Sequence, residues 1–167
     1  MIDIQVIKDL TTDPKLIEFA EFVIAETGDQ PFPDYKKMDL MKIPSLVRYV
    51  FVIKVEEKEG KRLLFHFSGS GFDELYDKNV TGLYLEDFYT GSNKETVIQI
   101  NNDTIDKQRP GYFYNRAVFM GGTYQKNRTI RRVSFPCSSN GKDINFVIGI
   151  VLFDLVDEGC PDVIKIL

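Results

Sequence analysis

The chain has 167 residues, of which 43% are hydrophobic and 28% are charged. This length suits one domain that buries about 70% of the surface its unfolded chain exposes. The composition excludes intrinsic disorder as the main state, because enough apolar surface is present to offset the entropy of ordering. A net charge of -4 argues against general nucleic-acid binding.

Cysteine and histidine are too scarce for a zinc site or a disulfide framework. The two cysteines, Cys137 and Cys160, lie far apart, and His66 is the sole histidine. We therefore predict a reduced, cytoplasmic protein without a bound metal. The longest apolar run, residues 146–153, is too short to span a bilayer, and the start of the chain lacks a signal-peptide pattern, so no membrane association is expected.

The first predicted element is an amphipathic helix over residues 14–26. Asp13 supplies a side-chain cap, and the proline after it stands where its missing N–H costs nothing. Leu16, Phe19 and Val23 repeat at helical spacing and form an apolar face. This face needs a partner, which is either the sheet of the same chain or a second subunit. We assign these three side chains as candidate dimerisation residues.

A β-hairpin follows, with predicted strands at residues 48–55 and 62–68. The first strand is rich in β-branched and aromatic residues, and the second alternates apolar and polar side chains. Short helical pieces follow, and a longer helix starts at residue 92 and ends near residue 108. Three further strands are predicted at residues 111–120, 128–137 and 145–155.

The last strand is apolar on both faces, which predicts a central position in the sheet. Pairing of this strand with the first strand closes a five-stranded antiparallel sheet in the order 2-1-5-4-3. The predicted fold is therefore α+β, with helices on one face of the sheet and an additional N-terminal amphipathic helix.

Several motifs in chain order carry a resemblance to a known family. They are Ile43-Pro44-Ser45-Leu46-Val47-Arg48-Tyr49-Val50-Phe51-Val52-Ile53, Phe65-His66-Phe67-Ser68-Gly69, Val80-Thr81-Gly82 with Leu85 and Phe88, Arg131-Arg132-Val133-Ser134-Phe135-Pro136, the turn Asn140-Gly141 and the apolar strand to Asp154. This ordered set resembles the PAS-domain superfamily, and most closely a short, often stand-alone bacterial PAS family. The resemblance covers about residues 38–154.

The resemblance implies a sensory or regulatory domain in bacterial signal transduction, and not an enzyme. PAS domains hold small molecules between the sheet and the helices and dimerise through flanking helices, so a homodimer is expected. With no output domain of its own, the chain would pass its signal to a separate protein. The implied organisation is an N-terminal helical extension at residues 1–37, a PAS-like domain at residues 38–155 and a C-terminal tail at residues 156–167. The alternative is a ligand-free protein–protein interaction module, dimerising around an interior filled by its own aromatic side chains.

The resemblance also bears on cofactors. Flavin-type and coumarate-type photosensors of this superfamily use a cysteine in the helical region, and residues 72–108 contain none. Haem sensors place a histidine on or near the long helix, whereas His66 is predicted on the second strand. Flavin and haem are therefore disfavoured, and the identity of any cofactor stays unknown.

Positive charge is concentrated in the last strands and their loops. Residues 107–142 hold eight basic and no acidic residues, whereas the rest of the chain carries 13 basic and 25 acidic residues. Because consecutive side chains of a strand face opposite sides, one of Arg131 and Arg132 must point toward the helix-covered face or be shielded by the N-terminal helix. A buried arginine requires a paired anion from the protein or from a ligand.

These observations predict a small-anion pocket. Its candidate ligand-binding residues are His66, Tyr112, Tyr114, Arg116 and Arg132. The alternative is that the arginines pair with acids of the protein itself, such as Asp87, Asp103 and Asp106. Nucleic acid is a weaker alternative, because the chain as a whole is acidic although basic and aromatic residues interleave here.

Overall fold

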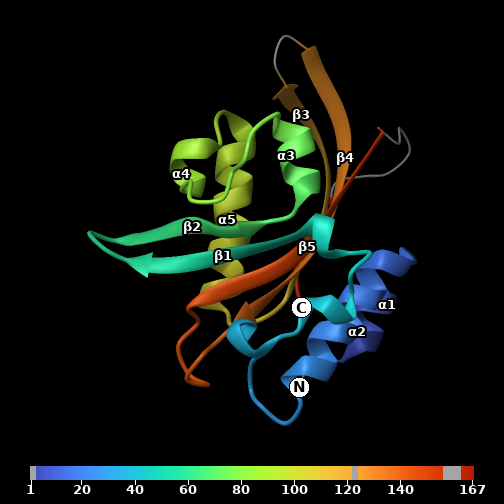
Figure 1. Ribbon diagram of the computed structural model, residues 1–167, viewed down its shortest axis with the longest axis vertical. Coiled ribbons are helices and arrows are strands. Elements are labelled where there is room, and N and C mark those ends of the chain that lie inside the picture. Colours follow the sequence, from blue (N-terminus) through green and yellow to red (C-terminus); the bar gives the residue numbers. More distant parts are fainter. Residues whose placement is uncertain (1–2, 122–123, 156–162) are drawn as a thin grey trace.

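The computed structural model describes residues 3–121, 124–155 and 163–167, and a sheet of antiparallel strands runs through its centre (Figure 1). The strands in these ranges are β1 (Val50–Glu57), β2 (Lys61–Ser68), β3 (Gly111–Gly121), β4 (Tyr124–Cys137), β5 (Phe146–Leu155) and β6 (Val163–Ile166). Their order in the sheet is β2-β1-β5-β4-β3-β6. The α+β class and the antiparallel sheet are confirmed, whereas the predicted number of five strands is wrong because β6 adds a sixth.

Helices cover both faces of this sheet, as Figure 1 shows. On one face lie α1 (Ile4–Lys8) and α2 (Pro14–Thr27), which three 3₁₀ turns connect to β1. On the other face lie the helices that connect β2 to β3. These are α3 (Ser70–Tyr76), α4 (Leu85–Phe88) and α5 (Ser92–Asp106).

The apolar face of α2 packs against the sheet of its own chain. Leu16, Phe19 and Val23 have no exposed surface and belong to one core cluster with residues of β1, β4 and β5. The ring of Phe19 lies 6.2 Å from the ring of Phe135 on β4. The structure therefore corrects the assignment of these three residues to dimerisation. Their side chains are already buried in cis and cannot reach a second subunit.

β5 has the buried central position that its sequence predicts. It pairs with β1 on one side and with β4 on the other. Ile148 and Ile150 pack in the cluster beneath α2, whereas Val147 and Val151 pack in the cluster beneath α3, α4 and α5. The strand thus contributes alternate side chains to the two hydrophobic layers.

β6 lies in the stretch that was predicted as a C-terminal tail. It pairs with residues 111–114 of β3, and the N–H of Leu167 donates to the carbonyl of Pro110 at 2.8 Å. Residues 156–162 of that predicted tail lie outside the described residues. β6 covers the edge of β3, so the backbone groups along residues 111–114 are paired and not open to another chain.

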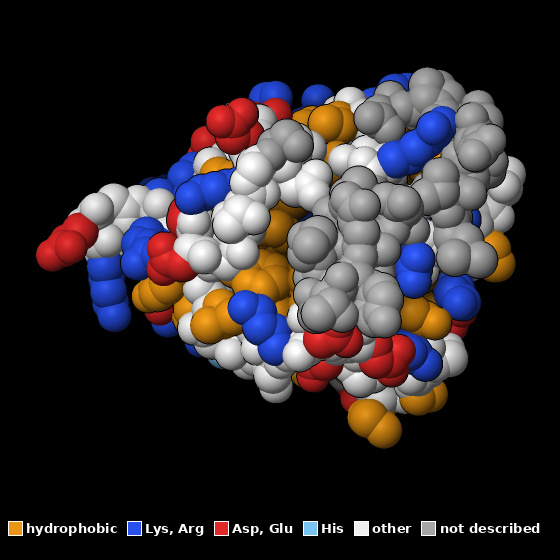
Figure 2. Space-filling view, turned by 90° about the horizontal axis from the view of Figure 1, so that it is seen from above, with side chains coloured by type: hydrophobic (Ala, Val, Ile, Leu, Met, Phe, Trp, Pro, Cys, Tyr) orange, Lys and Arg blue, Asp and Glu red, His pale blue; other side chains and the backbone are white. Residues whose placement is uncertain are grey.

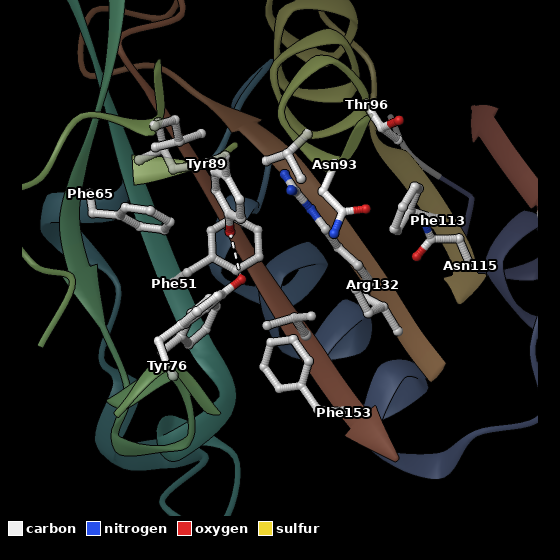
Figure 3. A pocket seen from close by; sticks show the side chains of 16 residues that line it. Phe51, Phe65, Tyr76, Tyr89, Asn93, Thr96, Phe113, Asn115, Arg132 and Phe153 are labelled. Carbon is white, nitrogen blue, oxygen red and sulfur yellow. Dashed lines mark hydrogen bonds between the residues drawn. The ribbon is translucent and has the colours of Figure 1, made fainter. Parts of the chain in front are cut away.

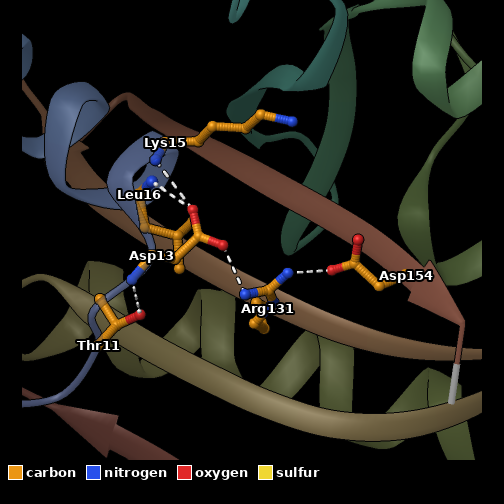
Figure 4. Close-up of polar contacts among 6 residues, drawn as sticks. All are labelled: Thr11, Asp13, Lys15, Leu16, Arg131 and Asp154. Atoms are coloured by element: carbon orange, nitrogen blue, oxygen red, sulfur yellow. Dashed lines mark hydrogen bonds and ion pairs between the residues drawn. The ribbon is translucent and has the colours of Figure 1, made fainter. Parts of the chain in front are cut away.

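Arg131 on β4 joins the start of α2 to the end of β5 (Figure 4). Asp13 Oδ1 accepts from the backbone N–H groups of Lys15 at 2.9 Å and Leu16 at 3.4 Å, which caps α2. Asp13 Oδ2 accepts from Arg131 Nη1 at 2.5 Å. Arg131 Nη2 donates to Asp154 of β5. One aspartate therefore serves as a helix cap and as an ion-pair partner of the sheet.

Removal of the Asp13 side chain should destabilise the protein. We expect Asp13→Ala to lower the free energy of unfolding by about 1–2 kcal/mol, because a helix cap and an ion pair are lost together. Asp13→Asn keeps a capping oxygen and should cost less than about 1 kcal/mol. Urea denaturation followed by circular dichroism measures both variants, and equal losses would contradict the capping role.

Candidate functional site

A cavity of about 40 Å³ lies between the sheet and the layer formed by α3, α4 and α5 (Figure 3). Its walls are largely aromatic and aliphatic. The polar side chains that line it are Tyr76, Tyr89, Asn93, Thr96, Asn115 and Arg132. A water molecule needs about 10–15 Å³ of such space, so the cavity has room for about three waters or one compact group of atoms. Sites for drug-sized ligands are larger, at about 300–1,000 Å³.

Arg132 extends from β4 into this cavity and is only 7% exposed. Its Nη2 donates to Asn101 Oδ1 at 2.5 Å, and its guanidinium carbon lies 4.4 Å from the centre of the Phe51 ring. Its Nε is buried and has no hydrogen-bond partner. Across the part of the chain that the structure describes, no carboxylate forms an ion pair with Arg132.

The guanidinium of Arg132 keeps its positive charge at neutral pH. Burial lowers its pKa from 12.5 to about 10, which is still far above neutrality. Burying a charged group without an opposite charge is costly, and such groups are concentrated at functional sites. An anion beside Nε would supply the missing hydrogen-bond acceptor and the missing negative charge.

Two tyrosines on the opposite cavity wall form a hydrogen-bonded pair. Tyr76 Oη donates to Tyr89 Oη at 3.2 Å (Figure 3). Burial raises the pKa of both phenols, so both remain protonated at neutral pH. Because Tyr89 accepts the proton of Tyr76, its own O–H is left to donate elsewhere. Among the residues described, no acceptor for this proton is found.

Asn115 places a hydrogen-bond acceptor in the same cavity. Its Oδ1 is buried and unpaired. Asn115 lies two residues beyond Phe113 on β3, and Phe113 is the register partner of Arg132 on β4. Asn115 and Arg132 are therefore diagonal neighbours on one face of the sheet, within reach of a long side chain. Figure 3 shows the Arg132 side chain between Tyr89 on one side and Asn115 on the other.

Gly149 allows Phe51 to lie close against the sheet. These two residues face each other in the pairing of β1 with β5. A Cβ atom at position 149 would stand 2.3 Å from Phe51 Cζ and 2.7 Å from the carbonyl oxygen of Val133. The missing side chain thus sets the position of the ring that the Arg132 guanidinium contacts.

Substitution of Gly149 should disturb both stability and the cavity. We expect Gly149→Ala to cost about 1–3 kcal/mol of unfolding free energy, because the methyl group overpacks the contact with Phe51. Denaturation measurements on Gly149→Ala and on the double variant Gly149→Ala/Phe51→Leu test the cause. The smaller leucine should restore part of the loss, and no restoration would show that the strain lies elsewhere.

Of the five ligand-binding residues predicted from sequence, Arg132 lines the cavity and the others do not. Tyr112 and Tyr114 are buried on the opposite face of the sheet, in the cluster beneath α2. Arg116 follows on β3 and is exposed. The five residues therefore do not form one pocket, because the register of β3 and β4 sets Arg132 opposite Phe113 and not beside a tyrosine.

His66 also lies outside the cavity. It is the extra residue on β2 at a register shift between β1 and β2, which is a β-bulge. Its exposed ring lies 5.7 Å from Tyr35 and 5.4 Å from Phe146, both on the α2 side of the sheet. The preceding residue, Phe65, lines the cavity instead.

Sequence reasoning missed most of the cavity. Phe51 and Asn115 lie on strands that the sequence predicts. Because side chains alternate between the two faces along a strand, the sequence could have shown which residues share a face with each of them. Tyr76 and Tyr89 lie in or next to short helices. The sequence pattern of that region did not show which of its side chains point toward the sheet.

Cys137 is a buried thiol away from the cavity, and burial raises its pKa from 9.0 to about 12. Disulfide exchange requires the thiolate, so the native protein should react slowly. In a Cys160→Ser variant, we expect a thiol reagent at mildly alkaline pH to modify native Cys137 at least about 100-fold more slowly than in the denatured chain. Similar rates in the two states would contradict the raised pKa.

Other classes of site are not found in residues 3–121, 124–155 and 163–167. No group of three or more His, Cys, Asp or Glu side chains is placed there to hold a metal ion. Within the same ranges, no helix has the length and hydropathy that a bilayer crossing requires. No protein-family model matches the chain, and no curated protein sequence matches it. The Arg132 cavity is therefore the strongest basis for a functional assignment.

Proposed function

We propose that this chain is a PAS-like sensory or regulatory domain that binds a small anion in the Arg132 cavity. One observation carries the proposal: a buried, protonated guanidinium whose Nε has no acceptor faces a cavity that contains no carboxylate. A buried arginine with a structural role alone is normally paired. Here the counter-charge is missing from the described part of the protein, so we assign it to a ligand.

The arrangement of the helices supports the PAS-like part of the proposal. The helices α3, α4 and α5 lie between β2 and β3 in the sequence and cover one face of the antiparallel sheet. The cavity lies between these helices and the sheet, where the resemblance implies that small molecules are held. Because a fold does not determine a ligand, the assignment to anions comes from Arg132 and not from the fold.

We propose binding and not catalysis at this site. The titratable side chains that line the cavity are Tyr76, Tyr89 and Arg132. All three hold their protons at neutral pH because their pKa values lie well above it. A general base needs a pKa close to the working pH, and none of these groups provides one.

The alternative, a ligand-free dimerisation module, has less support. The large hydrophobic side chains that are at least one-third exposed among the described residues come from separate segments: Val6, Met41, Leu83 and Ile164. Figure 2 shows charged side chains of both signs around a central depression in which hydrophobic side chains are visible. The apolar face of α2 is buried in cis. A homodimer stays a prediction, and its interface would use another surface.

Anions should stabilise the folded protein through Arg132. We expect a panel of small sodium salts, tested at constant ionic strength, to contain an anion that raises the melting temperature of the wild type. At about 100 times its dissociation constant, such a ligand adds about 2.7 kcal/mol, which corresponds to about 5–10 °C for a chain of this size. Arg132→Met should lose this shift, because the methionine fills similar space without a charge.

A matched control is Arg62→Met on β2. Arg62 is a partly exposed arginine paired with Asp87, and it does not line the cavity. Its variant should keep the full shift. The proposed function is wrong if no anion stabilises the wild type, or if Arg132→Met keeps the same shift while remaining folded.

A further inference from the structure

We propose that the ligand is a compact monovalent carboxylate with one additional hydrogen-bond donor, such as a short 2-hydroxy acid. This inference rests on the proposed function and names the chemical class of the ligand. Four features of the cavity carry it: its charge, its two unpaired donors, its unpaired acceptor and its volume.

The charge of the cavity selects a monovalent anion. Arg132 is the only charged side chain among the residues that line it. One negative charge on the ligand makes a neutral pair with the guanidinium. A divalent anion such as sulfate would leave one buried charge uncompensated, which is costly in an apolar environment. A neutral ligand would leave the guanidinium without a counter-charge.

The unpaired donors fit the two oxygens of a carboxylate. Arg132 Nε–H lacks an acceptor, and the O–H of Tyr89 is free to donate after accepting from Tyr76. Both side chains line the cavity, and Figure 3 shows Tyr89 next to Arg132. An ionised carboxylate only accepts hydrogen bonds, so each of its oxygens can take one of these two donors.

The unpaired acceptor calls for a donor on the ligand. Asn115 Oδ1 is buried, lines the cavity and has no partner. A ligand with a carboxylate alone would bury this oxygen without a hydrogen bond, which is unfavourable. A hydroxyl on the carbon next to the carboxylate can donate to Asn115 while the carboxylate contacts Arg132.

The volume limits the ligand to a few atoms. A cavity of about 40 Å³ accommodates about three water molecules, which matches a ligand of roughly three to six heavy atoms. The aromatic walls, including Phe51 and Phe153, leave no space for a longer chain unless they move. Glycolate and lactate fall within this range, whereas larger acids do not.

Isothermal titration calorimetry tests the class directly. Sodium glycolate, acetate and sulfate are titrated into the full chain at neutral pH and at a fixed chloride concentration. We expect glycolate to bind about tenfold more tightly than acetate, because only glycolate satisfies Asn115. We expect sulfate to bind at least about 100-fold more weakly than acetate, because it carries a second charge into the cavity.

Variants assign each contact to its residue. Asn115→Leu should bring glycolate down to the affinity of acetate and leave acetate almost unchanged. Tyr89→Phe should weaken the binding of both carboxylates by about tenfold, since one hydrogen-bond donor is lost.

Asn115→Asp places a carboxylate diagonal to Arg132. It should abolish binding of both acids and raise the melting temperature of the ligand-free protein. Circular dichroism verifies that each variant is folded.

The outcomes separate this inference from the proposed function. Sulfate binding as tight as acetate binding, with both lost in Arg132→Met, would leave an anion site but overturn the ligand class. Equal affinities for glycolate and acetate in the wild type would overturn the role of Asn115 and the hydroxy acid. Absence of any heat for all three salts, while another anion stabilises the wild type through Arg132, would also overturn the class. The proposed function itself would fall if no anion stabilised the wild type, or if a folded Arg132→Met variant kept the full stabilisation.

Discussion

Consecutive side chains of a β-strand point to opposite faces of the sheet, and on β4 this constraint sends two adjacent arginines into two different layers. Arg131 reaches the α2 layer, where Asp13 and Asp154 neutralise it. Arg132 reaches the α3–α5 layer, where the described residues offer it an amide and an aromatic ring but no carboxylate. The partly exposed Arg131 thus has two carboxylate partners, whereas the buried Arg132 has none among the described residues. This difference between the two layers is the basis on which we propose a ligand beside Arg132.

Gly149, which has no side chain, sets the position of the Phe51 ring in the wall of the cavity. Glycine within a strand weakens it and often marks a close approach of another group. Here the approaching group is the Phe51 ring, which in turn contacts Arg132. The glycine weakens the strand locally, but it lets the Phe51 ring lie beneath the Arg132 guanidinium. Departures from local rules of this kind are expected at functional sites.

Local patterns in the sequence predicted local structure well. Asp13 caps α2 as predicted, and the boundaries of β1 to β5 fall within a few residues of those expected. Contacts between distant segments could not be predicted in the same way. The register of β3 against β4, which sets Phe113 opposite Arg132, depends on the connection between the two strands and not on alternation within either. β6 was missed because a four-residue strand with a central lysine has almost no periodic signal.

The protonation states of the side chains that line the cavity determine whether anion binding depends on pH. Arg132, Tyr76 and Tyr89 each have a pKa well above the physiological range, and the single histidine lies on the other side of the sheet. An anion that binds here would neither take up nor release a proton near neutrality, so its affinity would not change with the acidity of its surroundings. Near neutral pH, the occupancy of the cavity would therefore depend on the concentration of the anion and not on pH.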